Sequence, residues 1–131
     1  IHRLNLEGNV ILTGARHDVE RYMQISDVLV LPSSYEAFGQ VIIEAMASGL
    51  KIVGYDNIIG KVKVATPEIT TTLNCAFLAQ AHTSHSLAEA MKMASKTEID
   101  KMKLSRRVHV EYSWDKFFSR VVEKIGVRTS E

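Results

Sequence analysis

Two glutamates lie eight positions apart, at Glu36 and Glu44, and their carboxylates could bind pairs of hydroxyl groups. Glu36 lies in a turn that contains Gly39, and Glu44 lies in an apolar run that favours a helix. The two oxygens of a carboxylate can accept two hydroxyl hydrogens, which suits the vicinal diol of a ribose. A buried carboxylate must be hydrogen-bonded, so apolar neighbours predict a buried Glu44 with such a partner. We therefore interpret Glu44 as a ribose ligand and Glu36 as a ligand of a second sugar.

The residues between the two glutamates could bind a phosphate. Gly39 lets the backbone turn tightly and approach a ligand, and the next residues begin a helix. The free N–H groups and the dipole at a helix start favour an anion. We expect the sugar and the phosphates to be bound by four backbone N–H groups, those of Phe38, Gly39, Gln40 and Val41. The side chain of Phe38 is interpreted as a packing residue. Phosphate, ribose and a further sugar together describe a nucleotide-sugar.

Strands and helices alternate along the chain. Asp27–Pro32 has the composition of a short buried strand, and ligands of open α/β sheets bind at the carboxyl ends of strands. Apolar patterns predict strands near Val10–Thr13, Val28–Leu31, Lys51–Tyr55 and Cys75–Ala79. They predict helices near Val19–Ile25, Gln40–Ser48, Ser86–Ala94, Glu98–Val110 and Trp114–Ile125. This alternation predicts the α/β class, with a Rossmann-like parallel sheet flanked by helices.

Helix ends are also marked in the sequence. Plausible N-cap residues are Asp18 for the first helix, Ser84 or Ser86 for the third, and Ser113 or Asp115 for the last. Gly49 is placed to end the helix that carries Glu44, in a left-handed conformation. The last two helices carry a basic cluster and an apolar stripe, which we interpret as a solvated face and a core-facing stripe. Packing of that stripe on another domain is the alternative.

The pattern Glu36-x7-Glu44-Ala45-Met46-Ala47-x-Gly49 resembles the signature of retaining, nucleotide-sugar-dependent glycosyltransferases of the GT-B fold. The resemblance is to their glycogen-synthase-like and sucrose-synthase-like branch. The stretches Asn9–Gly14, Asp18–Ser33 and Tyr112–Lys116 are similar to that family as well. It implies that Glu36 is the acid that contacts the transferred sugar at the catalytic centre. It also implies that Gly14 and Arg16, in a loop after the first strand, lie near the nucleobase; for Arg16, stacking on the base and a free position in solvent stay open.

The resemblance implies a domain organisation too. Residues 1–126 correspond to the later part of a C-terminal donor-binding domain, and residues 127–131 to a frayed tail. The acceptor-binding N-terminal domain, and an early segment with an Arg and a Lys for the pyrophosphate, are not found in this chain. We expect such a fragment not to turn over substrate by itself, and any peripheral membrane association to depend on the missing domain. No metal or other cofactor is expected, and UDP is favoured as the commoner donor nucleotide.

The chain departs from the family pattern around the donor pocket. Leu50 follows Gly49 where proline is usual, a single Gly60 replaces a glycine pair, and Asn74-Cys75 replaces an Asn-Gly turn. These departures leave open a non-catalytic or degenerate domain that acts as a regulatory partner. A dehydrogenase-type Rossmann enzyme is disfavoured, because no Gly-x-Gly-x-x-Gly turn follows a strand.

Composition limits the other function classes. Hydrophobic residues make up 46% and charged residues 24%, and the formal net charge of +1 argues against a nucleic-acid binder. No apolar run approaches a membrane span, and the single Cys75 fits a reducing compartment, so we expect the cytoplasm. Cys75 is interpreted as a buried apolar residue. His82 and His85 have a spacing that can hold a metal, but their polar surroundings favour a surface linker. Bacterial surface polysaccharide synthesis is a reasonable context.

Overall fold

The computed structural model describes residues 1–125 and is built around a parallel sheet. Its strands are β1 (Val28–Leu31), β3 (Lys51–Tyr55) and β5 (Ala76–Ala79), in the order β1-β3-β5. Val28 is opposite Lys51, and Ile52 is opposite Ala76. The central strand β3 is buried throughout, as expected for an apolar strand with a partner on each side. The predicted α/β class with a parallel sheet flanked by helices is confirmed.

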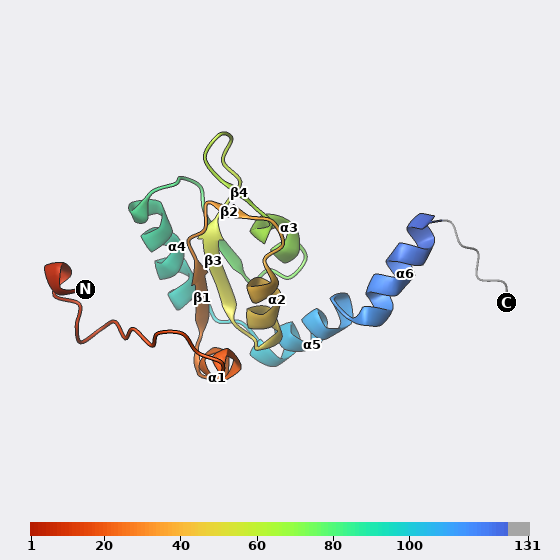
Figure 1. The fold of residues 1–131 in the computed structure, drawn as a ribbon, viewed down its shortest axis with the longest axis horizontal. Coiled ribbons are helices and arrows are strands. Elements are labelled where there is room, and N and C mark those ends of the chain that lie inside the picture. Colours follow the sequence, from red (N-terminus) through yellow and green to blue (C-terminus); the bar gives the residue numbers. More distant parts are fainter. Residues whose placement is uncertain (126–131) are drawn as a thin grey trace.

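Helices cover both faces of this sheet (Figure 1). Helix α4 (Ser84–Lys96) packs on β5 and β3, whereas α2 (Gln40–Ala47) packs on β3 and contacts α3 (Thr66–Thr70) and α5 (Lys101–Glu111). Successive side chains of a strand point to opposite faces, so Ile52 and Val53 enter different cores. Ile52 joins the cluster of Ile42, Met46, Leu50, Cys75, Leu104 and Val108. Val53 joins the cluster of Tyr55, Val62, Val64, Ala79, Ala90 and Ala94.

A second, very small sheet lies beyond the carboxyl end of β1. Strand β2 (Tyr35–Glu36) pairs in parallel with β4 (Lys63–Val64), so that Tyr35 is opposite Lys63 and Glu36 is opposite Val64. The pairing ties the turn that follows β1 to the loop that follows β3, and α3 begins directly after β4. These strands are not predicted from the sequence, since two residues are too few to show a period.

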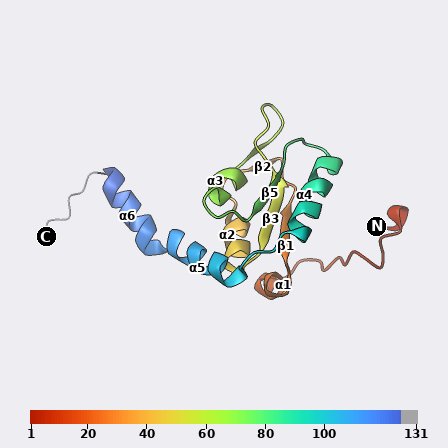
Figure 2. The ribbon, with the colours of Figure 1, turned by 180° about the vertical axis from the view of Figure 1, so that it is seen from behind.

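The N-terminal segment and the last helix extend away from the sheet in opposite directions (Figures 1 and 2). The segment contains a 3-10 helix η1 (His2–Leu4) and leads into α1 (Val19–Ile25). The strand predicted near Val10–Thr13 is wrong: these residues form no strand, and Ile11 and Leu12 are 87% and 81% exposed. A strand needs a partner for its backbone groups, and none of the described strands pairs with this segment.

The remaining predicted elements are present with small shifts. Helix α6 (Trp114–Ile125) has the predicted bounds, and Ser113 caps it by accepting a hydrogen bond from the Lys116 N–H at 3.2 Å. Thr83, rather than Ser84 or Ser86, caps α4, because its hydroxyl accepts the Ser86 N–H at 3.1 Å. The predicted tail, residues 127–131, lies outside the described residues. None of the helices in the described part of the chain is long and apolar enough to cross a bilayer.

Candidate functional site at the start of α2

Glu36 and Gly39 form the turn that begins α2. One carboxylate oxygen of Glu36, Oε1, accepts the backbone N–H of Gly39 at 3.1 Å and that of Phe38 at 3.4 Å. Gly39 occupies the N-cap position of α2 with a φ of +68°, and the Glu36 carboxylate holds the turn that leads to it. A Cβ at Gly39 would lie 2.8 Å from Cδ1 of Ile42. The turn therefore requires glycine at this position, as predicted.

The first turn of α2 offers hydrogen-bond donors to a ligand. The N–H of Ile42 is taken by the carbonyl of Gly39 at 2.9 Å. Among the described residues, no acceptor takes the N–H groups of Gln40 and Val41, as is usual at a helix start. The two N–H groups assigned to a ligand at Phe38 and Gly39 donate to Glu36 instead. An anion at this helix start would therefore meet Gln40 and Val41 first.

Two side chains of the motif, those of Glu44 and Phe38, are exposed, although the sequence predicts that both are packed against other residues. Glu44 is exposed, so the expectation that it is buried is wrong. Successive residues of a helix are rotated by about 100°, and Glu44 lies on the face of α2 opposite the buried Ile42 and Met46. Phe38 is 67% exposed, so it is not the packing residue we expected; it precedes the helix and enters neither core.

Gly14 and Arg16 are not brought to this site. Both belong to the N-terminal segment, which reaches the sheet where β1 begins, whereas Glu36 follows the end of β1 (Figure 1). Arg16 donates to both carboxylate oxygens of Asp18, at 2.9 and 3.0 Å, and lies over the ring of Tyr22 at 5.6 Å. The loop that contains Gly14 and Arg16 was expected to follow a strand at residues 10–13, and that strand is not formed. The carboxylate of Asp18 accepts hydrogen bonds from Arg16 and makes no capping bond to α1.

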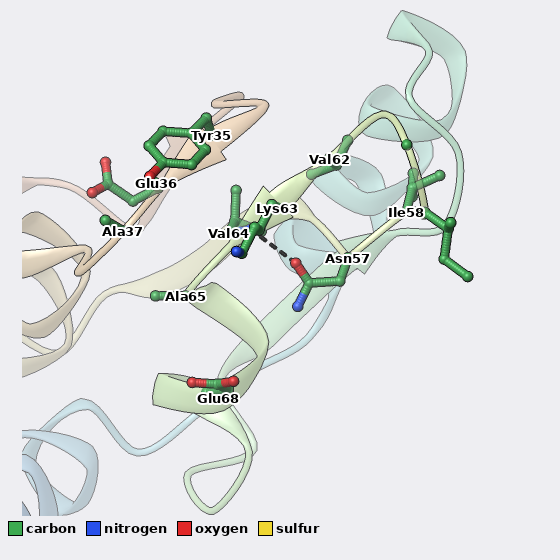
Figure 3. A pocket seen from close by; sticks show the side chains of 12 residues that line it. Tyr35, Glu36, Ala37, Asn57, Ile58, Val62, Lys63, Val64, Ala65 and Glu68 are labelled. Carbon is green, nitrogen blue, oxygen red and sulfur yellow. Dashed lines mark hydrogen bonds between the residues drawn. The ribbon is translucent and has the colours of Figure 1, made fainter.

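A pocket with a volume of about 600 Å³ includes Glu36 in its lining. Its walls come from β2, the loop after β3, β4 and the first turns of α3 (Figure 3). The polar side chains that line it are those of Tyr35, Glu36, Asn57, Lys63 and Glu68. The amide oxygen of Asn57 accepts the N–H of Val64 at 2.8 Å, which fixes the loop against β4. Glu36 therefore contacts the start of α2 and also lines this pocket.

Sequence reasoning missed four of these lining residues. Asn57 had a usable signal, since it follows the predicted strand Lys51–Tyr55 at its carboxyl end, where ligands of α/β sheets bind. Tyr35 and Lys63 had no such signal, because they reach the pocket through the pairing of β2 with β4.

Two other candidate residues, Cys75 and His82, pack against neighbouring side chains. Cys75 is buried, its Sγ lies 3.4 Å from Sδ of Met46, and burial raises the pKa of the thiol to about 11. His82 packs edge-on against Tyr55, with ring centroids 4.7 Å apart. Residues 1–125 contain no group of three or more side chains placed to hold a metal ion.

Comparison with known families gives one match over most of the chain. The family model described as Glycosyl transferases group 1 matches residues 1–109. That range includes Glu36, Glu44, the pocket and all strands of the two sheets.

Two curated relatives are similar over shorter stretches. A protein of Bacillus subtilis (strain 168), whose name describes it as a glycosyltransferase, EpsF, is 36% identical over 66 residues, which is 50% of this chain and 17% of the relative. The N-acetyl-alpha-D-glucosaminyl L-malate synthase of Bacillus anthracis is 35% identical over 54 residues, which is 41% of this chain and 14% of that enzyme. The matched segments therefore span less than a fifth of either relative.

Proposed function

The chain belongs to the glycosyl transferases group 1 family, and from this membership we propose that it is the donor-binding part of a glycosyltransferase. The enzyme would transfer a sugar from a nucleoside-diphosphate sugar to a hydroxyl acceptor, with retention at the anomeric carbon. Retention and the glycogen-synthase-like branch are proposed from the motif of Glu36 and Glu44. The acceptor would be bound mainly by a second domain.

The arrangement along α2 is the observation that carries this proposal. The unpaired N–H groups of Gln40 and Val41 lie at the start of the helix, and the exposed Glu44 lies about one turn further on. Four residues of helix correspond to a rise of roughly 6 Å. In a nucleotide, the diphosphate and the ribose are adjacent groups, so one ligand could place a phosphate on the N–H groups and its diol on Glu44. An exposed carboxylate is also accessible to such a ligand without a prior rearrangement.

Glu36 would contact the sugar of the donor. Its Oε1 atom already accepts two backbone N–H groups, but each carboxylate oxygen has two lone pairs and Oε2 accepts no hydrogen bond from the described residues. The carboxylate can therefore bind a sugar hydroxyl while it holds the turn in place. We propose that the helix start stabilises the leaving diphosphate, and that basic side chains elsewhere in the enzyme add to this effect.

A second candidate function is a regulatory domain that no longer binds a donor. The hydrogen bonds from Phe38 and Gly39 to Glu36 favour it, because they reduce the number of N–H groups left for a phosphate. Donor binding decides between the two functions, since a degenerate domain would bind no nucleotide.

Ligand-observed NMR on the 131-residue chain tests the proposal. The ligands are UDP, GDP, ADP and their common sugar conjugates, with UDP expected to bind. Glu44→Ala should weaken nucleotide binding at least severalfold, whereas Glu20→Ala removes an equally exposed helical carboxylate from α1 and should leave binding unchanged. If no nucleotide binds, this chain is not a donor site. If Glu44→Ala binds as tightly as the unchanged chain, the ribose assignment is wrong.

A further inference from the structure

We infer that the pocket beside Glu36 receives the sugar of the donor and selects an uncharged sugar, with Glu68 as the residue that disfavours sugars carrying a carboxylate. This inference rests on the proposed donor function and adds to it the class of sugar. Glu36 links the two regions, since it contacts the start of α2 and lines the pocket. A ligand with its diphosphate at Gln40 and Val41 would extend its sugar past Glu36 into this space.

The size and the lining of the pocket suit a sugar ring. A volume of about 600 Å³ lies within the range of small-molecule sites. Carboxylates at Glu36 and Glu68 can accept hydroxyl hydrogens, and the Asn57 amide and the Lys63 ammonium can donate. Tyr35 is 71% exposed and offers an aromatic surface to the C–H groups of a ring. The groups come from four separate segments (Figure 3), so they can contact different positions of one ring.

The charges around the pocket determine which sugars it accepts. Two carboxylates, Glu36 and Glu68, and one ammonium, that of Lys63, line the pocket. Within residues 1–125, neither Glu68 nor Lys63 forms an ion pair, so the carboxylates are not neutralised by a close partner. A further carboxylate, as in a uronic acid, would be repelled by this excess of negative charge. A neutral hexose or N-acetylhexosamine would meet hydrogen-bonding partners and no such repulsion.

Two charged residues of the pocket, Lys63 and Glu68, lie outside the proposed diphosphate-binding part of the site. Lys63 and Glu68 belong to β4 and α3, and both are exposed at the pocket rather than part of a core. Substitutions that change only their charge should therefore alter sugar selection and leave the fold intact. This separation allows the sugar preference to be tested independently of nucleotide binding.

Calorimetric titration of the 131-residue chain with UDP, UDP-glucose, UDP-N-acetylglucosamine and UDP-glucuronic acid tests the inference. We expect the two neutral conjugates to bind more tightly than UDP-glucuronic acid. Glu68→Gln should lower the ratio of the Kd of UDP-glucuronic acid to the Kd of UDP-glucose by about threefold, as expected for one charge acting through solvent over several ångströms. Lys63→Met should raise this ratio by a similar factor. Glu98→Gln removes an exposed charge that does not line this pocket and should leave the ratio of the two Kd values unchanged.

The outcomes separate this inference from the proposed function. If neither UDP nor any conjugate binds, both are overturned. If UDP binds but the three conjugates bind equally and Glu68→Gln changes nothing, the donor site stands and the charge selection is wrong. If UDP-glucuronic acid binds most tightly and Lys63→Met removes that preference, the pocket binds acidic sugars through Lys63, which overturns the inference.

Discussion

The carboxylate of Glu36 accepts the backbone N–H of Gly39 at 3.1 Å, so the first acid of the motif also holds the turn that begins the helix carrying the second. The N-cap of α2 is a glycine, which cannot supply a capping side chain. The conformation of the turn and the proposed contact with the sugar therefore depend on the same side chain. A substitution of Glu36 must consequently be examined for stability before any loss of activity is assigned to chemistry.

Replacement of Glu36 by alanine should lower the free energy of unfolding by about 1 kcal/mol, the usual net contribution of an intramolecular hydrogen bond. Glu36→Gln should cost less, because its amide oxygen can still accept the N–H of Gly39. Urea unfolding followed by circular dichroism measures both. Glu44→Ala, in the same helix but exposed, is the control and should change stability by less than about 0.5 kcal/mol. Equal stability of Glu36→Ala and the unchanged chain would show that the hydrogen bond does not stabilise the turn before α2.

Gly39 should tolerate alanine much less well than Gly60. Both have a positive φ, +68° and +72°, so an L side chain costs about 1 kcal/mol at either position. At Gly39 the new Cβ would also lie 2.8 Å from Cδ1 of Ile42 and 3.1 Å from Cδ1 of Ile69, whereas nothing lies within 4 Å at Gly60. Both contacts are with the ends of isoleucine side chains, which can shift, so the crowding should add up to about 1 kcal/mol. Urea unfolding of both variants gives the difference between their free energies of unfolding. An equal loss of stability at the two positions would contradict the close packing of this turn.

The core of the fold could be predicted from the sequence because its elements are set by local patterns. Val28–Leu31 and Lys51–Tyr55 are continuous apolar runs of strand length, and both form strands with the predicted bounds. Gly49 has the predicted left-handed conformation, with a φ of +81°, directly after α2. In each case the signal and the structure that it determines lie within a few neighbouring residues.

The parts that could not be predicted depend on distant partners. Val10–Thr13 has the composition of a strand, but no neighbouring strand pairs with it in the described part of the chain. Glu44 has apolar neighbours in sequence, yet those side chains lie on other faces of the helix. The pocket beside Glu36 exists because β2 pairs with β4, nearly thirty residues later. Local composition contains no information on such a pairing, so Lys63 could not be assigned to a site.

The ion pair between Asp27 and Lys101 should set part of the acid stability. Lys101 Nζ donates to Asp27 Oδ1 at 2.7 Å, and this hydrogen bond, with the attraction between the charges, lowers the pKa of Asp27 below its usual range. The pair therefore stabilises the folded state at and above the ordinary aspartate pKa, and the contribution is lost as the pH falls through the lower folded value. Lys101→Met should raise the pKa of Asp27, as measured by an NMR titration of its carboxyl carbon. Lys103→Met, also exposed on α5, should leave the pKa unchanged. A low pKa that persists in Lys101→Met would exclude this cause.

Cys75 should react slowly with thiol reagents while the chain is folded. Burial raises the pKa of the thiol to about 11, and only the thiolate reacts. Because the folded pKa lies above the unfolded one, this burial stabilises the fold at neutral pH, and the contribution is lost as the pH rises toward 11. The sequence has no other cysteine, so the rate of iodoacetamide modification at pH 8 reports on Cys75 alone. We expect a rate at least tenfold below that of the chain in guanidinium. Equal rates would show that the α2 side of the core opens readily.

Val108 and Val121 offer a matched test of where the stability of this chain resides. Both are valines in helices, but Val108 of α5 is 1% exposed, in the core with Leu104, whereas Val121 of α6 is 37% exposed and α6 contains no buried residue. The change in helix propensity on substitution by alanine is the same at both positions, so the difference between the two variants reports burial. Val108→Ala should lower the free energy of unfolding by about 2 kcal/mol through lost apolar burial and a cavity, and Val121→Ala by less than about 0.5 kcal/mol. Urea unfolding of the two variants gives both values. A loss at Val121 as large as that at Val108 would mean that α6 packs on an apolar surface in solution, and that the helix does not extend freely from the sheet.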